Sequence, residues 1–113
     1  MLNTTIVLFA LAAVFGLLLL LKVLKGESTS KVIVFIHGAL SATGLGLLIV
    51  YVINNYEGGP ILSLGLFIVA ALGGFVLFVL DLSKKTIPKV LALVHAGAAV
   101  VAFLLLLMFA FSL

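Results

Sequence analysis

Four long apolar stretches separated by short polar connectors constrain the fold of this chain more than any other feature. At about 1.5 Å of rise per residue, each stretch is long enough as a helix to cross the roughly 30 Å hydrocarbon core of a bilayer. Backbone polar groups in lipid must be satisfied internally, and the alternating pattern of a membrane barrel is absent. The sequence therefore predicts four transmembrane helices, with Pro60 and Pro88 in the first turns of the last two. Their expected ranges are Thr4–Leu24, Lys31–Asn54, Pro60–Leu82 and Ile87–Phe111.

The composition excludes a soluble domain. Of the 113 residues, 66% are hydrophobic and only 8% are charged, whereas soluble domains average about half apolar and a quarter charged residues. The formal net charge of +3 comes from lysines in connectors and at helix ends, so the chain has no basic face and nucleic acid is not an expected partner. Without cysteine, a disulfide framework, a thiolate metal site and a cysteine nucleophile are excluded. The expected surroundings are the lipid bilayer.

The connectors Lys25–Ser30, Asn55–Gly59 and Ser83–Thr86 are long enough only to reverse the chain, so neighbouring helices run antiparallel. All six lysines flank the first and third connectors. The positive-inside rule puts these two connectors in the cytoplasm, and both termini and the middle connector outside. We therefore expect an integral protein of the bacterial inner membrane whose residues 1–113 form a single antiparallel four-helix bundle.

The chain contains an internal repeat. Shifted by 58 residues, residues 8–51 align without a gap on residues 66–109, and His37 meets His95. The matches of Gly, Lys and His carry the most weight because these residue types are scarce here. Two tandem helical hairpins, residues 1–55 and 59–113, are predicted to share one topology and a pseudo-twofold axis along the membrane normal. Eleven further residues are identical to the residue 58 positions later, namely Leu8, Phe9, Ala12, Ala13, Gly16, Leu19, Leu24, Lys31, Val32, Leu47 and Leu48.

Small residues recur at spacings that let membrane helices approach closely. Because such rows usually serve helix packing, we predict helix contacts there and assign the glycines no chemistry. The rows are Ala12 with Gly16, Ala70 with Gly74, and Gly38 with Ala42 and Gly46.

His37 and His95 are the only ionisable residues away from the ends of the predicted helices. Each lies six residues after a lysine, Lys31 or Lys89, on a helix that runs outward from the cytoplasm. Both imidazoles should therefore lie at the same depth, about 9 Å from the lysine level, on opposite sides of the pseudo-twofold axis. Two facing imidazoles can act as the axial ligands of a haem iron, and helical bundles often build such sites in their cores.

Small side chains follow each histidine on the same helix face. Four and seven residues after His37 stand Ser41 and Gly44, and the same positions after His95 hold Ala99 and Ala102. These residues would leave a slot for a flat macrocycle, with Leu48 and Leu106 closing its far end. The predicted cofactor site thus consists of His37, His95, Ser41, Gly44, Ala99 and Ala102.

The two segments Lys31-x5-His37 and Lys89-x5-His95, set in a small all-helical bundle, resemble the transmembrane b-type cytochromes of the cytochrome b561 kind. The resemblance is one of architecture and covers the whole chain. It implies that His37 and His95 bind one haem b on the cytoplasmic side and that the protein takes part in electron transport with a redox partner. Members of that class typically hold two haems on four histidines, whereas this chain has two histidines.

Two other interpretations of the histidines stay open. Intramembrane histidines also serve as hydrogen-bonding residues between helices, which would make this a cofactor-free structural or interaction protein with a membrane-protein partner. In the second interpretation, His37 and His95 bind a metal or ligand other than haem.

Other classes fit less well. A proton-coupled drug transporter needs an intramembrane acid, and Glu27, Glu57 and Asp81 are placed in connectors or at interfaces. A hydrolase needs an oriented base beside a nucleophile, and no carboxylate is expected beside either imidazole. We expect no independent catalytic activity.

Overall fold

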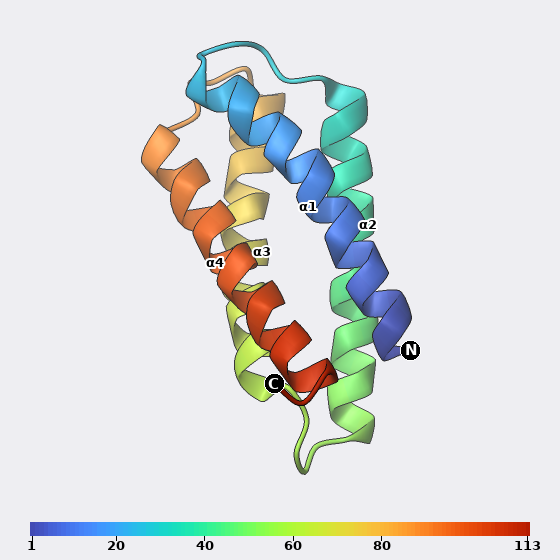
Figure 1. Ribbon diagram of the computed structural model, residues 1–113. Coiled ribbons are helices and arrows are strands. Elements are labelled where there is room, and N and C mark those ends of the chain that lie inside the picture. The colour runs from blue at the N-terminus through green and yellow to red at the C-terminus, as the bar shows by residue number, and fades with distance from the viewer.

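The structure, a computed structural model that describes residues 1–113, consists of four α-helices without strands (Figure 1). Each helix is long and apolar enough to cross a membrane. The predicted all-helical fold with four spans is confirmed, and the observed ends differ from the expected ones by at most two residues. The helices are α1 (Leu2–Leu24), α2 (Lys31–Asn54), α3 (Ile61–Leu82) and α4 (Lys89–Ala110).

Two of the shifted ends concern prolines. Pro60 and Pro88 are the N-cap residues of α3 and α4 and so lie one position before the helix, not inside its first turn. Pro88 has an extended conformation, with φ −63° and ψ 124°. In the first hairpin the N-cap of α2 is Ser30, whose hydroxyl accepts a hydrogen bond from the amide of Ile33 at 3.4 Å. The two hairpins therefore begin their second helices at equivalent positions.

The helices pack as two antiparallel hairpins, α1 with α2 and α3 with α4, and the hairpins touch each other less extensively through α1 with α4 and α2 with α3. Figure 1 shows both termini and the middle connector at one end and the other two connectors at the opposite end. The longest dimension of the bundle, 43 Å, matches the roughly 40–45 Å of a bilayer with its headgroup regions. The predicted bundle of two tandem hairpins is thus confirmed.

The turns after α1 and α3 show how closely the second hairpin repeats the first. Gly26 and Lys84 occupy equivalent left-handed positions, with φ 70° and 55°. The following amides, of Glu27 and Lys85, each donate to the carbonyl five residues earlier. This is the Schellman pattern of helix ends, and it occurs twice at a spacing of 58 residues.

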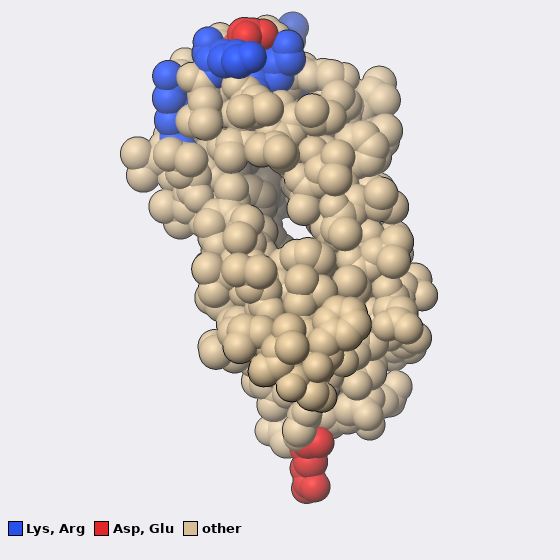
Figure 2. Space-filling view, viewed as in Figure 1, with Lys and Arg blue, Asp and Glu red and all other residues tan.

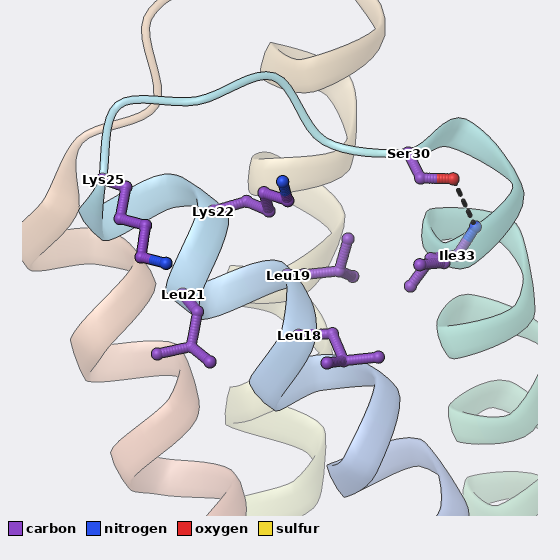
Figure 3. A pocket seen from close by; sticks show the side chains of 7 residues that line it. All are labelled: Leu18, Leu19, Leu21, Lys22, Lys25, Ser30 and Ile33. Atoms are coloured by element: carbon purple, nitrogen blue, oxygen red, sulfur yellow. Dashed lines mark hydrogen bonds between the residues drawn. The ribbon is translucent and has the colours of Figure 1, made fainter.

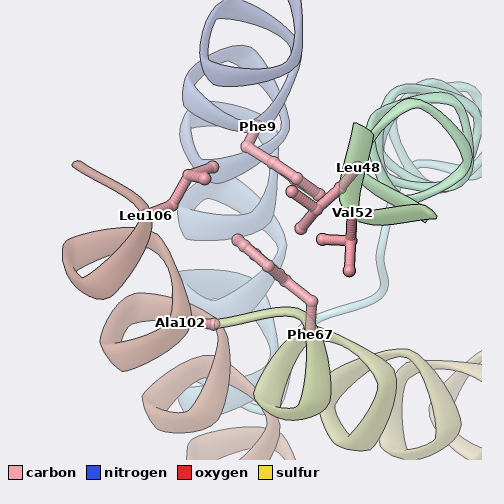
Figure 4. Close-up of a cluster of buried hydrophobic side chains, with 6 residues drawn as sticks. All are labelled: Phe9, Leu48, Val52, Phe67, Ala102 and Leu106. Carbon is pink, nitrogen blue, oxygen red and sulfur yellow. The ribbon is translucent and has the colours of Figure 1, made fainter. Parts of the chain in front are cut away.

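The hydrophobic core lies in the half of the bundle nearer the termini (Figure 4). Phe9 of α1 and Phe67 of α3 point toward one another and stack, with ring centroids 3.9 Å apart and planes at 5°. These two residues are equivalent in the repeat, so their stack marks the pseudo-twofold axis between the hairpins. Around it lie Leu48, Val52, Ala102 and Leu106.

The outer surface is apolar along most of its length. Only 13 of the 113 residues are buried, so a large apolar area faces outward, which a protein in water does not tolerate. The lysines gather at the end formed by the connectors 25–30 and 83–88, called the Lys-rich end below, and an acidic side chain marks the opposite end (Figure 2). The chain is an integral membrane protein.

One predicted row of small residues does not pack inside the bundle. A Cβ atom added to Gly38 or Gly46 would meet no atom within 4 Å, and Ala42 between them is exposed. No helix packs closely against this row, so the prediction of a helix contact there is wrong. Spacing alone could not show which small residues of α2 meet another helix, because α2 is apolar all round.

Candidate functional site

A cavity of about 800 Å³ lies between the two hairpins, on the Lys-rich side of the Phe9–Phe67 stack. Figure 2 shows an opening that passes through the molecule between the hairpins. Side chains of all four helices line the cavity, and most of them are apolar. The volume falls within the roughly 300–1,000 Å³ of ligand sites in proteins. Its polar lining includes His37 and His95, with Thr29 and Asp81 at the Lys-rich end.

Each histidine is held by a backbone carbonyl of its own hairpin. Nδ1 of His37 lies 2.8 Å from the carbonyl oxygen of Ala12 on α1, and Nδ1 of His95 lies 2.7 Å from that of Ala70 on α3. A carbonyl oxygen can only accept a hydrogen bond, so Nδ1 carries the hydrogen and donates it in both rings. These hydrogen bonds fix the orientation of both imidazoles.

The same hydrogen bonds set the chemistry of Nε2. A neutral imidazole with its hydrogen on Nδ1 has a free lone pair on Nε2. Neither Nε2 has a hydrogen-bond partner, and no buried side-chain nitrogen is without one, so both Nε2 atoms of the half-buried rings are accessible. Histidines that bind metals in proteins typically show this arrangement, in which the other ring nitrogen donates to a carbonyl or carboxylate.

Gly16 and Gly74 make room for the two rings. A Cβ atom on Gly16 would lie 2.9 Å from Cε1 of His37, and one on Gly74 would lie 2.8 Å from Cε1 of His95. Each glycine comes four residues after the alanine whose carbonyl holds the ring, so both lie on one face of the helix. The sequence indicated close packing at these glycines but not their role as seats for the imidazoles. The signal was the Ala-x3-Gly spacing, repeated in both halves together with the histidine.

The two imidazoles face each other across the pseudo-twofold axis, with ring centroids 6.3 Å apart and planes at 89°. If a metal binds both rings through Nε2 at about 2.0–2.1 Å, and each ring centre lies about 1.1 Å behind its nitrogen, the centroids are separated by roughly 6.2–6.4 Å. The separation of the ring centroids equals the one that a metal ion between the two Nε2 atoms requires.

Of the four small residues predicted beside the histidines, two line the cavity and two do not. Ser41 and Ala99, one turn beyond the histidines, are part of its wall. Gly44 is buried instead against the ring of Phe9, to which an added Cβ would approach within 3.1 Å. Ala102 is fully buried in the core cluster. Two turns beyond each histidine, the residues on this helix face therefore lie in the hydrophobic core that closes the cavity and not in the cavity wall.

The floor is formed by the hydrophobic core. Leu48 and Leu106, expected to close the far end of the slot, are fully buried in the same cluster as the Phe9–Phe67 stack. Ser63 anchors the second hairpin at this level, because its hydroxyl donates to the carbonyl of Ala102 at 2.7 Å.

Asp81 links the two hairpins at the Lys-rich end of the cavity. Its Oδ2 accepts a hydrogen bond from Nζ of Lys31 at 2.7 Å, and its Oδ1 accepts one from the hydroxyl of Thr29 at 2.8 Å. The Asp81 side chain is only 11% exposed, against 46% for Lys31. Val23 stands at the equivalent position of the first hairpin, so this link occurs once.

Comparison of the chain with known protein families, curated proteins and solved structures found no match. Within the structure, no group of three or more His, Cys, Asp or Glu side chains is placed to hold a metal ion. Structural zinc sites need four protein ligands, whereas haem iron needs only axial ligands because the macrocycle supplies the others. Two histidines with a large apolar cavity beside them fit the second case.

Proposed function

We propose that this protein is a membrane-embedded b-type haem protein in which His37 and His95 are the axial ligands of one haem. The observation that carries the proposal is the pair of Nδ1–H···O=C hydrogen bonds, which leaves both Nε2 lone pairs free. The spacing of the rings and the adjoining apolar cavity support it further. Ser41 and Ala99 belong to the walls of this site, and Gly44 and Ala102 support its floor.

A haem bound here supplies a one-electron redox couple. The chain's own residues would hold and tune it. The carbonyls of Ala12 and Ala70 orient the imidazoles and raise their basicity as ligands, and the apolar walls keep water away from the iron. If His37 and His95 both hold the haem iron, they would leave no position on it for a substrate. Electron transfer is therefore the function that this site favours, as in the cytochromes of the b561 kind that the sequence resembles.

The proposal extends to orientation and partners. We place the Lys-rich end in the cytoplasm of a bacterial cell, because all six lysines flank its connectors and cytoplasmic loops are enriched in lysine and arginine. The haem would then lie in the cytoplasmic half of the inner membrane. Since the chain has only two histidines, it would hold a single haem, and a redox partner has to carry electrons onward.

The visible spectrum tests this proposal. The full chain is purified in detergent from cells supplied with haem, and its spectrum is recorded oxidised and after reduction with dithionite. We expect a Soret band, sharp α and β bands on reduction, and about one haem per chain. A colourless protein that takes up no added haem would contradict the proposal.

The cofactor-free alternative has an observation of its own. The hydrogen bonds from His37 to Ala12 and from His95 to Ala70 each join the two helices of one hairpin, so they stabilise the fold without any ligand. If the purified chain is colourless, these histidines are structural, and the protein acts through a membrane-protein partner.

A further inference from the structure

A second, smaller hollow lies between α1 and α2 at the Lys-rich end, with a volume of about 280 Å³. Its lining changes in character along the helices (Figure 3). Its apolar part is formed by Leu18, Leu19, Leu21 and Ile33, and Lys22, Lys25 and Ser30 lie nearer the connector. We call it the α1–α2 groove.

Most of the α1 side of the groove comes from one helix face. Leu18, Lys22 and Lys25 are spaced at i, i+4 and i+7 and so start from one face of α1; Figure 3 shows the Lys22 side chain extending toward α2 and that of Lys25 extending beside Leu21. The two ammonium groups are therefore at the membrane interface, while the leucine extends the same face toward the bilayer centre. This order, cation above and hydrocarbon below, matches the order of groups in a phospholipid.

The charged groups at the groove are available for a further partner. Lys25 makes no ion pair, and Lys22 is bonded only to Glu27, at 2.9 Å, with both side chains about half exposed. Exposed pairs of this kind are weak, so Lys22 can turn to another anion at little cost. The hydroxyl of Ser30 accepts from Ile33 N–H, and its own hydrogen is free to donate. The first turn of α2 has no acidic residue.

We propose that the α1–α2 groove binds the headgroup phosphate of an anionic phospholipid. Lys22 and Ser30 would contact the phosphate, Lys25 would add its positive charge beside them, and the first methylene groups of the acyl chains would lie against Leu18 and Ile33. The groove is large enough for these groups but not for a whole lipid, whose remaining chains stay in the bilayer. This site is separate from the histidines and does not depend on haem.

The internal repeat supplies a matched control. The positions equivalent to Lys22 and Lys25 are Leu80 and Ser83 in the second hairpin, so no ammonium group occupies the corresponding face of α3. Lys84 and Lys85 lie in the other connector, at the same end of the bundle. Replacing the second pair of lysines removes the same charge from the same membrane surface without touching the groove.

The test is a titration of the full-length protein in detergent with phosphatidylglycerol, followed by native mass spectrometry. A lysine near an anionic lipid contributes about fivefold to binding, so the double variant Lys22→Gln/Lys25→Gln should lower the affinity roughly tenfold or more. Lys84→Gln/Lys85→Gln should lower it about twofold or less, since only long-range charge is lost. Glu27→Gln should raise it about twofold by freeing Lys22.

Two further arms separate the lipid from other sources of phosphate. Phosphatidylcholine, whose headgroup has no net charge, should bind at least about fivefold more weakly than phosphatidylglycerol. Inorganic phosphate at the same concentration should not displace the lipid, because it makes no contact with the apolar wall. Equal losses in the two double-lysine variants would overturn the proposal, as would displacement by inorganic phosphate.

Discussion

The imidazole rings of His37 and His95 stand nearly perpendicular, with their planes at 89° and their centroids 6.3 Å apart. The relative orientation of two axial imidazoles sets the splitting of the iron d orbitals. If His37 and His95 hold a haem iron as proposed, perpendicular rings should give an oxidised low-spin electron paramagnetic resonance spectrum dominated by one large g value. Parallel rings would give three well-separated lines. A three-line spectrum of the oxidised protein would show that the rings do not keep this orientation around the iron.

Gly16 and Gly74 should tolerate no side chain. Alanine at either position places a Cβ within 3 Å of a histidine ring, so the imidazole must move and its hydrogen bond to the carbonyl is strained. We expect each variant to lower the free energy of unfolding by about 1–3 kcal/mol and to weaken haem binding. Detergent unfolding curves and haem titrations measure the two effects.

The exposed glycines of α2 provide the control for this pair. Gly38→Ala and Gly46→Ala add a methyl group that meets nothing within 4 Å. Because alanine favours a helix over glycine by up to about 1 kcal/mol, both variants should be as stable as the parent or slightly more so. If they are as damaging as Gly16→Ala, the loss reflects helix glycines in general and not the seats of the imidazoles.

A side chain that fills the cavity should weaken haem binding, whereas one that disturbs the hydrophobic core beneath it should lower the stability of the fold. Ala99 lines the cavity, so Ala99→Leu is expected to weaken haem binding about tenfold or more while leaving the colourless protein stable. Gly44 packs on Phe9, so Gly44→Leu should displace the Phe9–Phe67 stack and lower the free energy of unfolding by about 1–3 kcal/mol. Comparing haem titrations with unfolding curves tells the two apart. Ala99→Leu with unchanged haem affinity would place the macrocycle elsewhere.

The link between Lys31 and Asp81 should hold the hairpins together at the Lys-rich end. Lys31→Gln leaves the largely buried carboxylate with only the Thr29 hydroxyl, and we expect the free energy of unfolding to fall by about 1 kcal/mol, a value reduced by the exposure of Lys31. Lys89→Gln is the matched control, because Lys89 is the equivalent residue in the repeat and makes no ion pair. Equal stabilities of the two variants would mean that the link contributes nothing.

The fold was predictable because it depends mainly on the lengths of the apolar segments and connectors and on the internal repeat, all of which can be seen in the sequence. Apolar length gives the four helices, and short connectors give the antiparallel hairpins. The repeat pairs Phe9 with Phe67 and His37 with His95, which placed equivalent residues on opposite sides of one axis. The helix ends were less predictable, since Pro60 and Pro88 fit both the N-cap and the first turn.

The site was predictable only in part, for reasons of geometry. The histidines, Ser41 and Ala99 do line one cavity, because residues one turn apart share a helix face. Gly44 lies two turns from His37, where the hairpins have already converged on the stack. The contact between Gly16 and the His37 ring was not predicted, because spacing along α1 does not show which side chain of α2 lies opposite.

Asp81 shows a similar limit. Its position near the end of α3 indicated an interfacial acid, and the sequence does not show that its carboxylate turns into the cavity lining toward Lys31. Contacts between residues some 50 positions apart depend on how the two hairpins sit against each other. That arrangement is a property of the packed bundle and not of any one segment.

The most direct test of the central claim is the absorption spectrum of His37→Ala and His95→Ala, each measured with and without added imidazole. If both side chains are axial ligands, each variant loses the six-coordinate low-spin spectrum, and free imidazole, which fits the space left by the ring, restores it. Ser41→Ala, on the same wall of the cavity, should keep the spectrum of the parent. A haem spectrum that survives unchanged in either histidine variant would contradict the account.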